Sequence, residues 1–406
     1  MKITGIETLR VADRPSVIWV RVATSDDLVG LGETWFGADA VEADIHDRIA
    51  PLILGCDASD ITELAQVMKP YVGFCGTGAE MRALSAVEVA LWDAAGKAAG
   101  RPLCDLLGGA LHQTVPVYNT CAGPDYVSNT SDVRPGNFGL PGGDTARLSS
   151  RRYEDLDAFL NRPAELAADL LEMGITSMKI WPFDFAEDAD KGEISDADLA
   201  KTIKPFEAIR AAHGGRMRIK AELHGLWTLD AAMKICRALE PLEVDWVEDA
   251  VNMDRMDLLG ALAEATSLPL SGGETLGGLG QIEDLITRGK VAVPIVDVTW
   301  GGGVGFAMDA AALAAAHRRP IAFHDCSGPV ALAVSSHLAM ACPNVEEQEI
   351  TRAFYYDWYG QAVTGLPRIA EGMISVPATP GHGVSLMPEL GSRASRRTSG
   401  TMPGAN

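Results

Sequence analysis

The sequence is poor in positive charge and lacks the long apolar segments of membrane and secreted proteins. Its 406 residues include 34 Lys and Arg against 55 Asp and Glu, which gives a formal net charge of −21. Because nucleic-acid binding needs a basic footprint, this balance argues against it, and also against an anionic membrane surface. No apolar run reaches the length of a membrane span, and the start MKITGIETLRVADRP lacks the apolar core of a signal peptide. We expect a soluble cytoplasmic protein. An anionic substrate stays open, since a bound cation can reverse the local field.

Cysteine pairs are also missing. The seven cysteines are scattered, odd in number and form no CxxC motif. This usage is typical of reduced thiols in a cytosolic protein and argues against a disulfide framework or a zinc site.

The amino-terminal part of the chain mixes strands and helices. Residues 1–36 alternate apolar and polar side chains around turn signals, which predicts about three antiparallel strands. Residues 39–108 have helical spacing, and the helix within 84–109 should end at Gly100 and Pro102. We therefore predict an α+β domain over residues 1–113.

From residue 114 short apolar runs alternate with amphipathic helices. The expected strands lie in 115–120, 176–181, 218–223, 244–249, 268–274, 293–298, 320–325 and 344–350. Eight strands alternating with helices predict an α/β fold, a closed (β/α)8 barrel over residues 114–365, with an open doubly wound sheet as the alternative. Residues 124–154, rich in Gly, Pro, Ser and Asn, predict a long loop and a candidate lid. Residues 392–406 have the composition of a disordered tail.

A polar residue closes each of the later barrel strands. These residues are Glu222 with His224, Glu248, Glu274, Asp297, His324 and Glu349, at intervals of 26, 26, 23, 27 and 25 residues from Glu222 onward. One βα unit of a barrel takes about 30 residues, so these side chains should lie at one height on the carboxyl-terminal rim, where barrel enzymes carry out chemistry.

Three of these residues predict a metal site. A single acid at a strand end is more often a helix cap than a ligand. However, Glu222, Glu248 and Glu274 on three adjacent strands would repel one another unless a cation lay between them. Three carboxylates with room for water and substrate suit Mg²⁺.

The next two strand ends predict an acid–base pair. Adjacent strands lie roughly 4.8 Å apart, so the carboxylate of Asp297 should reach the imidazole of His324. It would fix the tautomer and raise the basicity of the ring. Next to a metal site this favours a general base, whereas alone His324 would be interpreted as a structural histidine.

These residues resemble the mandelate racemase/muconate lactonising enzyme branch of the enolase superfamily. The resemblance covers nearly the whole chain and includes SAVEVALWDAAGKAAGRPLCDLLGG, the acids in KAELHG, DWVEDA and SGGET, and PATPGHGV at 377–384. It implies a modified (β/α)8 barrel with an amino-terminal capping domain that residues 366–391 complete. It further implies Mg²⁺ on Glu222, Glu248 and Glu274, a catalytic Asp297/His324 dyad, and a Glu349 that binds the substrate carboxylate, with Glu347 as the fallback.

Three positions distinguish the chain within that family. Racemases of this branch carry Lys-x-Lys on the second strand, but here Lys179 is followed by Trp181. The first metal ligand is commonly Asp, whereas this chain has Glu222. His224 resembles the general acid of the galactonate-type and mannonate-type sugar-acid dehydratases, two residues after the first ligand.

The resemblance thus favours a Mg²⁺-dependent lyase that removes the proton next to a carboxylate and eliminates water, converting a sugar acid or diacid to a 2-keto-3-deoxy acid. His324 would be the base, His224 the acid, and Lys179 and Glu349 would stabilise the negative charge. The same chemistry would serve an epimerase, a racemase or a sugar-lactone cycloisomerase, with Lys179 as a second base. A non-catalytic, metal-stabilised barrel that binds an acid is the other alternative. Capped barrels often assemble, so we expect a homo-oligomer.

Overall fold

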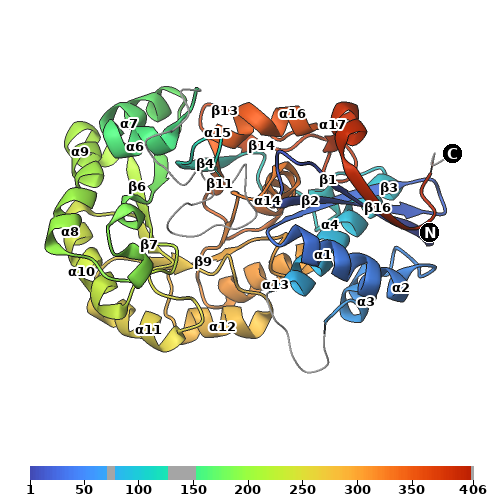
Figure 1. Ribbon diagram of the computed structural model, residues 1–406, viewed down its shortest axis with the longest axis horizontal. Helices are drawn as coiled ribbons and strands as arrows, with labels where there is room; N and C mark the ends of the chain where they lie inside the picture. The colour runs from blue at the N-terminus through green and yellow to red at the C-terminus, as the bar shows by residue number, and fades with distance from the viewer. Residues whose placement is uncertain (71–77, 127–151, 404–406) are drawn as a thin grey trace.

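The computed structural model describes residues 1–70, 78–126 and 152–403 and contains two domains side by side (Figure 1). The cap holds a four-stranded antiparallel sheet in the order β16-β1-β2-β3. Its strands are β1 (Ile3–Arg10), β2 (Val17–Thr24), β3 (Val29–Trp35) and β16 (Ser395–Gly400). Its helices are α1 (Ala38–Asp44), the π-helix Ile45–Ile49, α2 (Ala50–Ile53), α3 (Ile61–Val67), α4 (Ala79–Ala99) and α5 (Leu103–Leu106).

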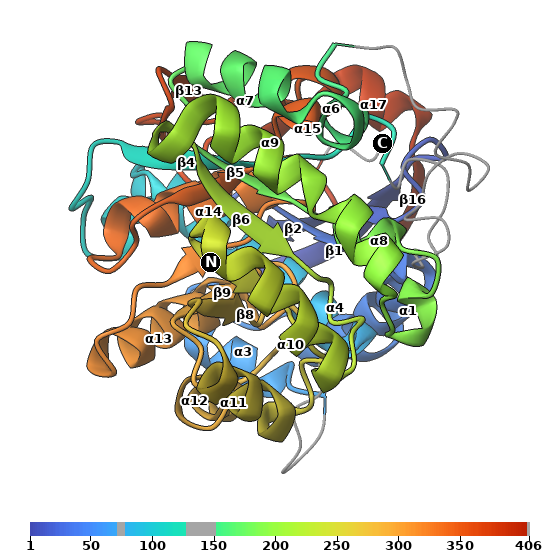
Figure 2. The same ribbon diagram turned by 90° about the vertical axis from the view of Figure 1, so that its left-hand side faces the viewer.

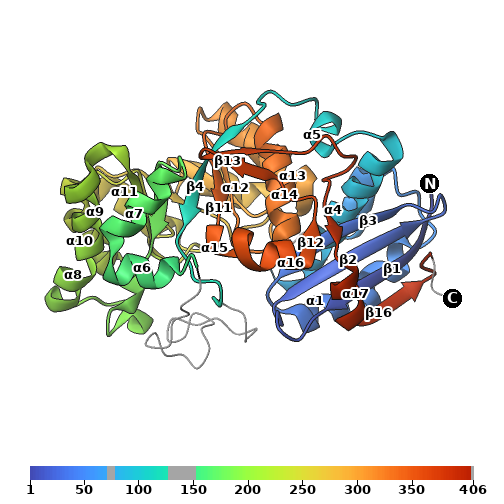
Figure 3. The same ribbon diagram turned by 90° about the horizontal axis from the view of Figure 1, so that it is seen from above.

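Helix α4 is the predicted long helix of the cap, and it packs on β3. Its residues Met81 to Gly96 are largely buried, and it ends at Gly100, whose φ of 65° is the left-handed conformation that suits glycine after a helix. At Gly30 and Gly32 of β3 a side chain would collide with the backbone of α4. The two elements therefore touch through backbone atoms and lie side by side in the cap (Figure 3), and Trp35 is the last residue of β3.

The barrel closes, so the alternative of an open sheet is wrong. Parallel pairing runs β4-β5-β6-β7-β8-β9-β10, and β11 pairs with β4. A single bridge between Ile321 and Val345 joins the segments leading into β10 and β11. The strands are β4 (Val115–Thr120), β5 (Ser177–Ile180), β6 (Arg218–Glu222), β7 (Trp246–Glu248), β8 (Leu270–Gly272), β9 (Val293–Val296), β10 (Ala322–Phe323) and β11 (Gln348–Ile350).

Helices surround this ring of strands (Figures 1 and 2). They are α6 (Asp155–Asn161), α7 (Pro163–Glu172), α8 (Asp196–Thr202), α9 (Lys204–His213), α10 (Leu229–Leu239), α11 (Met256–Ala265), α12 (Leu279–Thr287), α13 (Gly303–Ala316), α14 (Pro329–Ala341), α15 (Arg352–Phe354) and α16 (Gly360–Ala362), with the π-helix Tyr355–Tyr359 and 3₁₀ turns at Pro182–Phe185, Ala189–Lys191, Gly214–Arg216 and Glu240–Leu242. None of the helices within the described residues has the length and apolarity to cross a membrane.

The end of the chain returns to the cap and forms a strand there, although its composition predicts a disordered tail. After the short strands β12 (Val363–Thr364), β13 (Arg368–Ala370), β14 (Met373–Ser375) and β15 (Ser385–Leu386) comes α17 (Pro388–Arg393). The composition predicts a disordered tail over 392–406, but within it Ser395–Gly400 forms β16 and pairs with β1 from Gly5 to Arg10. The open edge of β1 supplies the backbone partners, and Arg397 pairs with Asp47. The polar composition of this segment gave no strand signal, because the strand forms by pairing with the edge of β1, which is distant in sequence.

Two buried glutamates of the cap hold the domains together. Glu88 on α4 accepts hydrogen bonds from the N–H groups of Val304 (2.7 Å) and Gly305 (2.9 Å), the first turn of α13. Glu33 on β3 does the same for α14, at Val330 (3.0 Å) and Ala331 (3.1 Å). Each of these two barrel helices thus receives from the cap a carboxyl group that accepts the free N–H groups of its first turn.

The glycines that precede these two helices make the contact possible. Gly302 and Gly328 are the N-cap residues of α13 and α14, and neither has a side chain to cap the helix. A side chain at Gly328 would collide with the Glu33 carboxylate, and one at Gly303 would collide with Glu88. The glycine-rich stretch around 301–303 therefore serves docking of the cap.

The Glu88 contact makes stability depend on pH. Burial raises the pKa of Glu88 from 4.5 to about 7, although its N–H donors lower it. The folded state therefore binds a proton that the unfolded state has lost, so this contribution is complete below pH 4.5 and disappears as the pH rises through about 7. Between about pH 5 and 8.5, wild type should lose about 3 kcal/mol more unfolding free energy than Glu88→Gln.

Urea unfolding at several pH values measures this difference. Glu63→Gln, at an exposed position on α3, is the matched control and should follow wild type. Stability curves for wild type and Glu88→Gln that stay parallel across this range would contradict the assignment.

Candidate active site

A cavity of about 200 Å³ opens at the carboxyl ends of the barrel strands, beneath the edge of the cap. It is lined by Trp35 and Phe36 of the cap and by Thr120, Ala122, Tyr126, Lys179, Trp181, Glu222, His224, Leu226, Glu274, Trp300, His324, Cys326 and Glu349 of the barrel. The predicted strand-end residues thus converge, with Glu248 directly beside Glu222 in the β6–β7 register.

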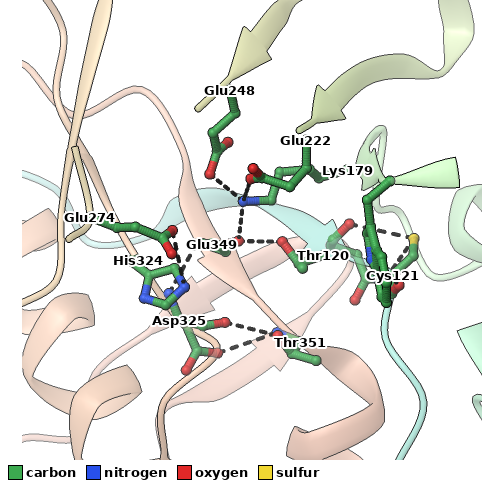
Figure 4. Close-up of polar contacts among 12 residues, drawn as sticks. Thr120, Cys121, Lys179, Glu222, Glu248, Glu274, His324, Asp325, Glu349 and Thr351 are labelled. Atoms are coloured by element: carbon green, nitrogen blue, oxygen red, sulfur yellow. Dashed lines mark hydrogen bonds and ion pairs between the residues drawn. The ribbon is translucent and has the colours of Figure 1, made fainter. Parts of the chain in front are cut away.

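Lys179 lies at the centre of the acidic residues (Figure 4). Its Nζ is 3.1 Å from Glu222 Oε2 and 3.1 Å from Glu349 Oε1, and it also forms an ion pair with Glu248. Burial lowers the pKa of Lys179, but the carboxylates of Glu248, Glu349 and Glu222 raise it further, so the pKa lies well above its usual value. Lys179 is therefore an ammonium bound to three carboxylates.

One lysine does not balance the negative charge around it. Burial and repulsion from Glu222 raise the pKa of Glu248 well above its usual value, and burial together with repulsion from Glu222 and Glu274 does the same to Asp249. Burial also raises the pKa of Glu274, although His324 and Lys179 lower it. Carboxylates in such excess favour a further cation in this pocket.

The donor set fits a hard divalent cation. Carboxylate oxygens are its preferred ligands, and the Lys179 ammonium already stands as a positive charge between Glu222 and Glu248. Across the described parts of the chain, no three His, Cys, Asp or Glu side chains form a ready ligand group. In this arrangement Glu222 and Glu248 face Lys179, while Glu274 Oε2 lies 3.4 Å from His324 Nε2.

Asp297 and His324 form the expected pair. His324 Nδ1 lies 2.7 Å from Asp297 Oδ2, which also accepts a hydrogen bond from the hydroxyl of Ser327 (2.6 Å). The backbone N–H and hydroxyl of Thr299 donate to the other oxygen of Asp297. Burial lowers the pKa of His324, but Glu274, Glu349 and Asp297 raise it to about 10. With Nδ1 held by Asp297, Nε2 is the ring nitrogen that faces Glu274.

His224 has a carboxylate partner that the sequence did not reveal. It follows β6 with a φ of 49°, and its Nδ1 pairs with the buried Asp184. Its side chain is 30% exposed, at the cavity wall. Burial lowers the pKa of His224, but Asp184 and Glu222 raise it to about 9. Asp184 lies in a 3₁₀ turn after β5, outside the strand-end positions from which the site residues were predicted.

The two glutamates at the eighth strand have different positions. Glu349 lines the cavity, accepts from the N–H of Asp325 (3.0 Å) and pairs with the Thr120 hydroxyl. Glu347 instead pairs with Lys220 (2.9 Å), deeper in the barrel, and is absent from the cavity lining. Of the two candidates for a substrate contact, only Glu349 reaches the cavity.

The spacing of apolar residues alone would assign two tryptophans to the core, but both contact residues of the site. The indole of Trp181 stands at the position where the resemblance implies a second lysine. It donates to the Cys121 carbonyl (3.0 Å) and lies edge-on to the His224 ring. Trp246 on β7 donates from Nε1 to Glu248 Oε2 (2.8 Å), and Lys220 Nζ lies 4.2 Å from its ring. Trp246 thereby orients one of the carboxylates around Lys179.

Comparisons with known proteins agree with this architecture. The family model for the mandelate racemase/muconate lactonizing enzyme N-terminal domain matches residues 7–108, and the enolase C-terminal domain-like model matches residues 162–390. A D-galactonate dehydratase from Verminephrobacter eiseniae is 28% identical over 95% of this chain and 92% of its own length. A D-mannonate dehydratase from Rhizorhabdus wittichii is 26% identical, with 97% and 95% covered.

Solved structures of similar proteins cover the whole chain. An enolase of the mandelate racemase subgroup from Agrobacterium tumefaciens is 40% identical, with a TM-score of 0.86 and 99% of both chains covered. An enolase from Sargasso Sea environmental sequence is 39% identical, with a TM-score of 0.86 and 98% and 99% covered. Both domains of the fold, the closed barrel and the strand-end site lead to one conclusion: the chain belongs to the mandelate racemase/muconate lactonizing enzyme branch of the enolase superfamily.

Proposed function

We propose that this enzyme is a Mg²⁺-dependent dehydratase that converts a sugar acid to a 2-keto-3-deoxy acid. The observation that carries the proposal is a second His–Asp pair, His224 with Asp184, in the same cavity as His324 with Asp297. In the ring of eight strands, β6 and β10 are four strands apart, so the two histidines follow strands on opposite sides of the mouth. Elimination of water needs a base and an acid, and this arrangement supplies one of each.

Glu222, Glu248 and Glu274 would hold the metal ion. Bound there, Mg²⁺ would supply positive charge to the substrate carboxylate as the enolate forms, which is the role the ion has in enolase-superfamily sites. Trp246 would hold Glu248 in position through its 2.8 Å hydrogen bond. Lys179 and Glu349 would bind the carboxylate end of the substrate.

The base in this proposal is His324. Removing the proton at C2 is difficult because the remaining electron pair adds charge to a carboxylate. Glu274 is the main cause of the raised pKa of His324, so with Glu274 bound to the metal ion the His324 ring would be neutral. Asp297 keeps the remaining proton on Nδ1, so that Nε2 accepts the C2 proton, and it stabilises the imidazolium that results. Ser327 and Thr299 hold Asp297 in place.

The acid is His224. Paired with Asp184, it is an imidazolium at neutral pH and gives its proton to the C3 hydroxyl as the C3–O bond breaks. Water leaves, and the resulting enol becomes the 2-keto-3-deoxy acid. Names of relatives support this reaction class, since D-galactonate and D-mannonate dehydratases align along almost the whole chain.

Epimerisation is the second candidate, because His224 could also act as a base on the opposite face. It would use the same metal and His324, and it would exchange the C2 proton without loss of water. Lys179 supports this alternative less, since its ammonium is engaged by three carboxylates and Trp181 replaces the second lysine. A non-catalytic acid-binding barrel would leave two His–Asp pairs in one cavity without a role. Assembly into a homo-oligomer in the cytoplasm stays a prediction.

Replacing each histidine by asparagine separates the two steps. General acid–base catalysis contributes about 10²–10⁴-fold, so either variant should lose about that factor in formation of 2-keto product. In D₂O, His224→Asn should still exchange the C2 proton, because His324 remains, while His324→Asn should lose exchange as well. NMR of the substrate and a 2-keto assay provide the two readouts.

His317→Asn, at an exposed position after α13, is the matched control and should behave as wild type. Dehydration by His224→Asn at a near-normal rate would exclude His224 as the acid. Exchange at C2 by wild type without product would favour epimerisation.

Trp246→Phe tests the metal ligands without relying on turnover. It removes the N–H that holds Glu248, so the affinity for Mn²⁺, read from the electron paramagnetic resonance of the free ion, should fall about 10-fold or more. Trp227→Phe is the control, because within the described residues the buried Nε1 of Trp227 has no hydrogen-bond partner. Equal Mn²⁺ affinity in both variants and wild type would contradict the proposal that Trp246 holds Glu248 in position for the metal ion.

A further inference from the structure

Asp325 is a buried acid to which the proposed reaction gives no role. It directly follows His324 in the sequence, and its side chain is fully buried. Asp325 is also not among the described residues that line the cavity. Because a buried carboxyl group is costly unless hydrogen bonds compensate it, its partners indicate what it does.

The seam between β10 and β11 is the place where this acid lies. Neighbouring parallel strands are normally joined by a backbone ladder. Among the residues that the structure describes, these two strands share no ladder, and one bridge joins Ile321 and Val345 at their start. Toward the barrel mouth, side chains take the place of the ladder, as where Gln348 donates from Nε2 to the Phe323 carbonyl (3.0 Å).

Asp325 supplies the links of the seam that lie nearest the mouth. The Thr351 N–H donates to Asp325 Oδ2 (3.2 Å), and the Thr351 hydroxyl donates to the Asp325 carbonyl (2.8 Å) (Figure 4). Tyr359, the last residue of the π-helix Tyr355–Tyr359, donates its hydroxyl to Asp325 Oδ1 (2.9 Å). Both oxygens of Asp325 are therefore held by residues that follow β11.

The backbone of Asp325, held in this way, orients Glu349. Its N–H donates to Glu349 Oε2 (3.0 Å). The other oxygen of Glu349, Oε1, pairs with the Thr120 hydroxyl and lies 3.1 Å from Nζ of Lys179, which lines the cavity. One oxygen of Glu349 is thus fixed at the seam, and the other meets a charged residue of the cavity.

We infer that Asp325 is a positioning residue for Glu349. Its side chain, bound by Thr351 and Tyr359, holds the backbone N–H that sets the direction of the Glu349 carboxyl group toward the substrate. The inference deepens the proposed function and rests on it, since that proposal assigns Glu349 to the substrate carboxylate. Asp325 itself would touch no reacting atom.

Exchanges of Asp325 test this role on the full chain with Mg²⁺ and whichever of D-galactonate and D-mannonate it dehydrates. Asp325→Ala removes both anchored oxygens, so Glu349 should lose its direction and kcat/KM should fall about 10²-fold. Asp325→Asn should stay close to wild type, because its amide oxygen still accepts from the Thr351 N–H and the Tyr359 hydroxyl can turn to accept from its amide nitrogen. Wild-type kcat/KM in Asp325→Ala would overturn the inference.

A milder exchange avoids the risk that Asp325→Ala does not fold. Tyr359→Phe removes one hydrogen bond to Asp325, and kcat/KM should fall about threefold to tenfold. Tyr355→Phe is the matched control in the same helix, because the Tyr355 hydroxyl donates to the Pro367 carbonyl (2.7 Å), and it should behave as wild type. Equal kcat/KM in the two variants would contradict a role for the Tyr359 contact.

Two readouts separate positioning of Glu349 from a general loss of structure. In a Glu349→Gln background, Asp325→Ala should lower kcat/KM by only about twofold or less, because the residue through which it acts is already altered. The affinity for Mn²⁺ should fall far less than kcat/KM, since Glu222, Glu248 and Glu274 belong to other strands. A full effect in the Glu349→Gln background, or an equal fall in Mn²⁺ affinity, would overturn the inference.

Failure of the proposed function would look different, because wild type would then form no 2-keto product from either acid. Crystal structures of wild type, Asp325→Ala and Tyr359→Phe test the inference in that case as well. The Glu349 carboxyl group should leave the N–H of residue 325 in Asp325→Ala and shift in Tyr359→Phe. A Glu349 that keeps its wild-type position in both variants would overturn the inference.

Discussion

The ammonium of Lys179 among three buried carboxylates is the interaction on which the rest of the site depends. Parallel strands bring Glu222, Glu248 and Glu349 to the barrel mouth, and burial makes their mutual repulsion strong. One lysine compensates part of this charge. The remainder explains why the pKa values of Glu248 and Glu274 are raised and why the mouth favours a further cation. The same charge raises the pKa values of His224 and His324.

Buried carboxyl groups also attach the cap to the barrel. Glu33 and Glu88 accept from the first turns of α14 and α13, which begin with glycines and so lack capping side chains of their own. These contacts fix β3 and α4 against the barrel. The position of β3 in turn places Trp35 and Phe36 in the lining of the cavity. The contacts that join the domains therefore also set the shape of the cavity on its cap side.

Features that repeat along the chain could be predicted from the sequence, and features that need a distant partner could not. Glu222, Glu274, Asp297 and His324 recur once per βα unit, so spacing alone brought them to one rim, and the pairing of Asp297 with His324 followed from adjacent strands. Asp184 lies in a turn 40 residues from His224, and no local pattern connects the two. Trp246 looks like an ordinary core aromatic until its N–H is seen on Glu248. The strand Ser395–Gly400 is polar and largely exposed, and it is held by pairing with the edge of β1 and by contacts such as Arg397 with Asp47.

Anomalous diffraction from crystals soaked in Mn²⁺ tests the central claim most directly, because it locates the cation without reference to turnover. The account predicts one strong peak between the carboxylates of Glu222, Glu248 and Glu274, with Lys179 no longer paired to both Glu222 and Glu248. A barrel mouth without a peak, in which Lys179 keeps its three carboxylate partners at a saturating concentration of the ion, would contradict it.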